Sequence, residues 1–298
     1  MLESDFGWLP ETRHYASGSL QISPLESAEH VIQSIREHPR SDGKWLHPPL
    51  IEEGLGAPPS MQRPLVYAPS FQVDPTHVIR TNIPNESRPY LHFQIQVLGL
   101  AQGLRLVPRG WTHFYRLCLR PGGLTDLVCT PPDVETILAG AEAFWLSHPA
   151  GRTRRLMFGA IHWHLFAQSY LHEFEIFNAE YTVLDTCFRI HCEIAGTAAT
   201  PSHSRRPSFL CEQYGIPIPP WAAVTSTGSC RLADLRNELV HEAQYAGQSI
   251  GFAYPPDAYS LDVQLACLNT RLLIALLGFR TSYVTSRVDT RGKCSFAL

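Results

Sequence analysis

The most informative part of this sequence is Leu232-Ala-Asp-Leu-Arg-Asn-Glu-Leu-Val-His241. At about 100° per residue, this pattern predicts an amphipathic helix over residues 231–245, with an apolar face and a polar stripe on the opposite side. The apolar face comprises Leu232, Leu235, Leu239 and Ala243, and the polar stripe comprises Asp234, Asn237, His241 and Tyr245. The stretch therefore predicts a helix that packs on a core.

Arg236 lies outside the polar stripe of this predicted helix, about 200° from Asp234 and among the leucines. An arginine aimed at a core needs a carboxylate partner, because an unpaired buried charge is very costly. The nearest candidates are Asp185 and Glu180 on the preceding predicted helix. The long side chain also allows the guanidinium to curl to the edge of a groove, so both placements stay open.

The remaining sequence after residue 130 also predicts mainly helices. Pro132, with Asp133 and Glu135 in the first turn, begins a helix that ends near residue 147. Further helices are predicted over residues 153–170, 173–194 and 255–277, whereas residues 196–229 have the composition of a loop. The 255–277 segment is apolar nearly all round, so we expect it in a core or a dimer interface.

The N-terminal part of the chain has a different composition. Twelve of the 24 prolines lie in residues 1–90, which excludes long helices there. We expect short strands over residues 19–22, 77–83 and 104–107, and a helix over 91–102 that ends at Gly103. The chain is therefore predicted to be an α+β protein: a mixed, proline-rich region over 1–148, an all-α helical bundle over 150–286, and a tail over 287–298.

The central motif resembles that of a known family. Arg236-Asn237-x-x-x-His241 is similar to the R-polar-x₃-H signature of HEPN domains, over about residues 150–280. The surrounding order agrees: a long helix ending in Val183-Leu184-Asp185, a variable loop, the motif helix, and a leucine-rich helix. In the abortive-infection (Apea-like) branch of this family, a poorly related N-terminal region precedes the HEPN domain. The order of regions in this chain resembles that arrangement. Position 185 is Asp, where the family often has Glu.

This resemblance implies a bundle that dimerises and cleaves RNA without a metal or cofactor, at a composite site across the dimer interface. His241 would move a proton, Arg236 would stabilise charge on the phosphate, and Asn237 would orient either group. The 2′-hydroxyl of RNA would be the nucleophile. Asp185 and Glu180 would support the arginine. The implied biology is an anti-phage or toxin-type effector in the cytoplasm, controlled by a phage trigger or an antitoxin. By analogy of architecture, the region over 1–148 would sense that trigger or restrain the nuclease.

Composition limits how such a protein could hold RNA. The net charge is −3, so RNA contact needs a local basic site rather than a polycationic surface. Two groups of arginines are candidates for phosphate binding. Arg152, Arg154 and Arg155 lie at the start of a predicted helix, and Arg205 and Arg206 lie in the loop predicted over 196–229. Solvated surface charge is the other explanation, and 22 arginines among 24 basic residues also fit a GC-rich genome.

Other patterns argue against competing functions. His162 and His164 point about 200° apart on a helix, so they cannot share a metal ion and are expected to be core or surface residues. Among the eight cysteines there is no C-x-x-C pair, which weakens a zinc or redox site. We find no signal-peptide or membrane-span pattern, and expect no membrane partner. The alternative function is a catalytically inactive helical binding or regulatory module.

Overall fold

The computed structural model describes residues 1–47, 71, 73–83, 87–110, 114–149, 151–197, 201–250, 261–289 and 292–297. Within these residues the largest sheet is antiparallel, with strand order β2-β3-β5-β1-β6. Its strands are β1 (Leu2–Gly7), β2 (Tyr15–Ser17), β3 (Leu20–Pro24), β5 (His77–Thr81) and β6 (Val107–Pro108). The strands predicted near residues 20 and 80 are confirmed, and the one over 104–107 shrinks to the two residues of β6.

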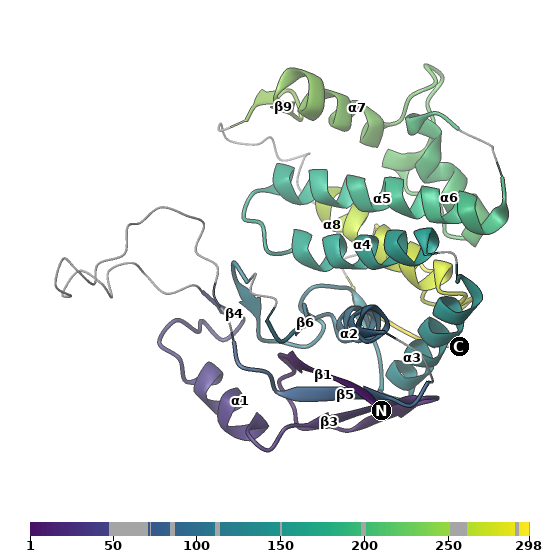
Figure 1. Cartoon of the computed structure of the whole chain (residues 1–298). Helices are drawn as coiled ribbons and strands as arrows, with labels where there is room; N and C mark the ends of the chain where they lie inside the picture. Colours follow the sequence, from purple (N-terminus) through teal and green to yellow (C-terminus); the bar gives the residue numbers. More distant parts are fainter. Residues whose placement is uncertain are drawn as a thin grey trace.

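Helices from the first half of the chain cover this sheet (Figure 1). α2 (Arg88–Gln102) packs on β1 and β5, and α3 (Pro131–Ser147) packs on β2. α2 ends as predicted at Gly103, whose positive φ of 57° lets Leu104 N–H reach the Gly99 carbonyl. A short helix that the sequence did not predict, α1 (Ala28–Arg36), buries Val31, Ile32 and Ile35 in a smaller apolar cluster with Trp8.

The second half forms a helical layer in which α4 (Arg152–Ala167), α5 (Glu173–Ala195) and α8 (Leu261–Leu276) pack on one another. α6 (Arg206–Tyr214) lies in the segment predicted as a loop, a correction that follows from its buried Leu210, Cys211 and Tyr214. α7 (Arg231–Asn237) lies on the outer side of α5, away from the sheet (Figure 1). α8 is buried nearly all round, as predicted, and the start predicted for it at residue 255 lies outside the described residues.

The two halves share a continuous hydrophobic core. One cluster of buried side chains includes Phe6 and Phe93 from the first half and Phe177 and Leu272 from the second, on both sides of the boundary predicted near residue 149. The C-terminal segment adds β11 (Cys294–Ser295), which pairs in parallel with β8 (Leu127–Val128). Two further strands, β4 (Trp45–Leu46) and β7 (Leu117–Cys118), pair antiparallel.

The architecture is therefore a mixed α+β fold, as predicted. Its sheet and its helical layer lie on opposite sides of α2 (Figure 1). Among the described residues, no helix combines the length and the apolar character that crossing a membrane requires.

Candidate functional site

The predicted motif helix divides into two parts. α7 buries Leu232 and Leu235 and ends at Asn237, where a π-helical turn over Glu238–Glu242 begins. In this wide turn the N–H of Ala243 bonds to the carbonyl of Glu238, five residues earlier. The predicted helix over 231–245 is thus too long at its C-terminal end. The chain continues into a hairpin of β9 (Gln244–Tyr245) and β10 (Gln248–Ser249).

The hairpin and the Glu238 side chain hold the π turn in place. Glu238 accepts a hydrogen bond from the backbone N–H of Gly247 at 3.0 Å and lies 3.5 Å from the guanidinium of Arg231. Tyr245 is buried, with its ring against Phe177 of α5. These contacts attach both ends of the turn to the rest of the fold.

The π turn brings the three motif residues together. Nη1 of Arg236 donates to Nε2 of His241 and to Oδ1 of Asn237, each at 3.1 Å. In a regular α-helix, residues five apart point about 140° away from each other. A turn with i→i+5 hydrogen bonds places them on one side instead. Arg236 is half-buried and the other two are exposed, so the cluster opens to solvent.

This arrangement corrects the expected partners of Arg236. Asp185 bonds instead to Nη1 of Arg206 at 2.8 Å, and its other oxygen lies 3.5 Å from Nδ1 of His203. Glu180 is fully buried and bonds to other groups. The reason is that the guanidinium curls along the π turn toward His241, which is the groove-edge placement left open by the sequence.

Glu180 belongs to a buried polar network in the helical layer. Its carboxylate lies 2.9 Å from Nδ1 of His164 and accepts hydrogen bonds from Asn269 at 2.7 Å and Gln168 at 3.0 Å. Nε2 of His164 lies 2.9 Å from Oγ1 of Thr270. His164 and Glu180 are 0% exposed. His164 is therefore a core histidine, as predicted, and Glu180 links α4, α5 and α8 rather than serving the motif.

A second polar group, which sequence reasoning missed, lies near Arg236. Oη of Tyr181 is 3.3 Å from Nδ1 of His203. The pKa of Tyr181 is raised to about 12, mainly by burial and further by the charge of Asp185, while the nearby Arg236 and Arg206 oppose the rise. Burial also lowers the pKa of His203; Asp185 raises it, and the arginines lower it. In the sequence, Tyr181 shares one face of the predicted 173–194 helix with other aromatic residues, and this pattern indicates a core face rather than a binding site.

The arginines proposed to bind RNA have different surroundings. Arg152 forms an ion pair with Glu193 at 3.0 Å, and Arg154 lies over the ring of Trp145 and donates to its carbonyl. Arg206 is placed at the start of α6 by its bond to Asp185, rather than in a loop. The remaining two, Arg155 and Arg205, are exposed. These two are the better placed of the five to meet a phosphate.

In the part of the chain that the structure describes, no three His, Cys, Asp or Glu side chains are grouped to hold a metal ion. Comparisons with protein-family models, with curated proteins and with solved structures found no match to this chain.

Proposed function

We propose that this chain is a metal-independent endoribonuclease that cleaves RNA by attack of the 2′-hydroxyl, and that it acts as a cytoplasmic toxin-type or anti-phage effector. The observation that carries the proposal is the cluster of Arg236, Asn237 and His241, gathered at the surface by the π turn. π turns inside helices occur frequently at functional sites. The resemblance of the same three residues to the HEPN signature supports the same reaction.

The residue types suit this chemistry. Arg236 donates to Nε2 of His241, so the lone pair that a general base needs faces the guanidinium. A phosphate bound by Arg236 replaces that hydrogen bond and frees Nε2 to take a proton from the 2′-hydroxyl. The guanidinium then stabilises charge on the phosphorane oxygens. As the 2′-oxygen bonds to phosphorus, the bond from phosphorus to the 5′-oxygen breaks, and protonated His241 returns its proton to that leaving oxygen. The products are a 2′,3′-cyclic phosphate and a 5′-hydroxyl.

The proposed homodimer has a candidate surface beside the motif. A groove of about 420 Å³ is lined by the π turn, by α4 and α5, and by Ile250 after the hairpin. Trp163, Val240 and Ile250, three of its apolar side chains, are 43%, 50% and 37% exposed. Such exposed apolar groups favour association. Because Val240 adjoins His241, a second copy seated here brings two motifs to one interface.

The test compares cleavage of total RNA in the presence of EDTA by wild type, His241→Ala, Arg236→Lys and Glu242→Ala. Glu242 is the exposed neighbour of His241 on the same turn and serves as the matched control. We expect His241→Ala to lower the rate by about 10²–10⁴-fold. Arg236→Lys keeps the charge but loses the planar donor fork, so it also loses activity. Glu242→Ala should cleave like wild type and leave cyclic phosphate ends.

Two outcomes contradict the proposal. Unchanged cleavage by His241→Ala would show that the motif is not the site. RNA binding by the wild type without any cleavage would favour the inactive binding module instead. Trp163→Glu, measured by light scattering after gel filtration, tests the dimer surface: a variant that stays dimeric and active excludes this groove.

A further inference from the structure

A cavity of about 490 Å³ lies where the first turns of α2 and α4 meet the last turn of α3. Small-molecule sites in proteins usually have volumes of about 300–1,000 Å³. None of the motif residues Arg236, Asn237 and His241 is among the described residues that line this cavity. It is therefore a site separate from the proposed ribonuclease centre.

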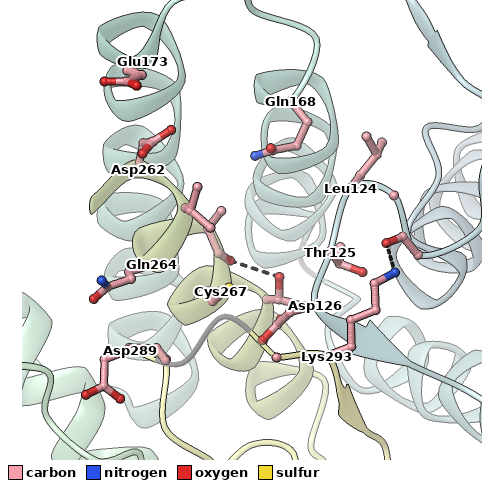
Figure 2. Close-up of a pocket in the computed structure, with 17 residues that line it drawn as sticks. Leu124, Thr125, Asp126, Gln168, Glu173, Asp262, Gln264, Cys267, Asp289 and Lys293 are labelled. Atoms are coloured by element: carbon pink, nitrogen blue, oxygen red, sulfur yellow. Dashed lines mark hydrogen bonds between the residues drawn. The ribbon is translucent and has the colours of Figure 1, made fainter. Parts of the chain in front are cut away.

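A larger cavity, of about 710 Å³, differs from this one in the charge of its lining (Figure 2). Four of the described residues around the larger cavity are acids, namely Asp126, Glu173, Asp262 and Asp289. Lys293 also lines it and donates to the carbonyl of Gly122. The acids disfavour an anionic ligand there, because like charges repel.

The smaller cavity, in contrast, has arginines and no acid in the chain that surrounds it. Its described lining residues come from α2, the end of α3, and α4 with the residue before it. The sequence contains no Asp or Glu over residues 87–125 or 143–172, which include all of α2 and all of α4. Arg154 and Arg155 both line the cavity, and neither forms an ion pair with an acid among the described residues. The cavity therefore carries positive charge.

The position of these arginines in their helix is unfavourable without an anion. Arg152, Arg154 and Arg155 lie in the first turns of α4, where the helix dipole disfavours positive charge. The first turn contains no acid, and its N-cap residue is Gly151. Glu193 of α5 neutralises Arg152 at 3.0 Å, which leaves the two arginines of the cavity. A bound anion would remove the unfavourable interaction of those two with the helix dipole.

The cavity also offers flat surfaces for an aromatic ring. The guanidinium of Arg154 lies over the ring of Trp145, 4.3 Å from its centroid, and Nε donates to the Trp145 carbonyl at 2.8 Å. These contacts hold the guanidinium plane in place, and planar rings stack on such a plane. Phe158 and Pro89 supply apolar walls. Burial is the main cause that lowers the pKa of His92, so this lining residue is a neutral ring at pH 7.

We propose that this cavity binds a free nucleoside monophosphate, whose base packs against Arg154 and Phe158 and whose phosphate is bound by Arg155. A phosphate monoester carries a charge of about −1.5 to −2 at pH 7, which matches two guanidinium groups better than a single carboxylate does. The guanidinium fork binds phosphate oxygens in pairs. Arg155 is exposed and donates no side-chain hydrogen bond within the described structure, so its donors are available to the phosphate.

The experiment is calorimetric titration of the full-length protein with AMP, GMP, CMP and UMP, each separately. We expect one of these nucleotides or more to bind saturably, with one molecule per chain. Adenosine, which lacks the phosphate, and inorganic phosphate, which lacks the ring, are the ligand controls. Each should bind at least about tenfold more weakly than the best nucleotide, because each uses only one half of the site.

Matched variants test the two halves of the cavity. Arg155→Gln removes a charged donor, and Phe158→Leu keeps an apolar side chain but removes the ring. Each should bind the best nucleotide at least about tenfold more weakly than wild type. Arg189→Gln, which changes an exposed arginine on α5 outside this cavity, should bind like wild type.

Three results overturn this proposal: no saturable binding of any of the four nucleotides, unchanged affinity in either cavity variant, or a control ligand that binds as tightly as the best nucleotide. Loss of folding does not mimic the expected result for Arg155→Gln, because removing an exposed positive charge from a helix start should not lower the unfolding temperature. Thermal unfolding of each variant checks this. The readout is binding alone, so it fails or succeeds independently of the proposed ribonuclease activity.

Discussion

Asp262 makes an unfavourable contribution to stability that a single substitution should remove. Its carboxylate is buried at the start of α8, and its folded pKa is raised from 3.8 to about 6. Burial is the largest cause, and the charges of Glu173 and Glu180 add to it, while the backbone N–H of Val263 partly opposes it. Asp262→Asn keeps the shape of the side chain and removes its charge.

The magnitude follows from the pKa difference between the folded and unfolded chain. One pKa unit corresponds to about 1.4 kcal/mol, so the ionised Asp262 lowers the free energy of unfolding by about 3 kcal/mol. The carboxyl group of Asp262 binds its proton more tightly in the folded chain than in the unfolded chain. The free energy of unfolding therefore falls as pH rises between about 4 and 6. The free energy of unfolding of Asp262→Asn should therefore exceed that of wild type by about 1 kcal/mol at about pH 4.5 and by about 3 kcal/mol at about pH 8.

The assay is urea unfolding followed by tryptophan fluorescence at both pH values. Thermal unfolding should show a gain of about 6 °C at about pH 8, because 1 kcal/mol shifts the midpoint by about 2 °C in a chain of this length. The control variant Glu212→Gln, which changes an exposed acid on α6, should have the same free energy of unfolding as wild type at both pH values. A variant no more stable than wild type at about pH 8, or a difference that does not change with pH, would refute the reasoning.

Two further substitutions test the packing of the helical layer and the hairpin by the same urea assay. Glu180→Ala removes the buried carboxylate that His164 and Asn269 contact, so the free energy of unfolding should fall by about 3–5 kcal/mol; a loss below about 1 kcal/mol would contradict the network. Ala246→Asn should gain roughly 0.5 kcal/mol, because Ala246 has a positive φ of 52° in the hairpin turn, where Asn is preferred. A loss of stability in that variant would count against the turn geometry.

Local sequence signals predicted several helices to within a few residues. The start of α3 followed from Pro132 and the acids after it, and its capping box between Thr130 and Asp133 is the physical basis of that signal. The end of α2 followed from Gly103, which adopts the left-handed conformation that ends helices. Each signal acts through hydrogen bonds within one turn of the chain, which is why it can be recognised without the fold.

The errors occurred where distant contacts determine local structure. α6 was predicted as a loop because Pro, Ser and Gly dominate its surroundings, yet its buried side chains pack against α5 and α8. The helix after Arg231 ends early because the hairpin and the buried Tyr245 hold the chain in a π turn. Local periodicity contains no information about either contact.

The sequence by itself determined which chemical groups the candidate site holds, namely Arg236, Asn237 and His241, and predicted the amphipathic helix that carries the first two. Only the tertiary structure decided that Arg236 meets His241 and that Glu180 belongs to the core. The physical reason is range: helical periodicity acts over three to five residues, whereas ion pairs and cavities form between segments that folding brings together.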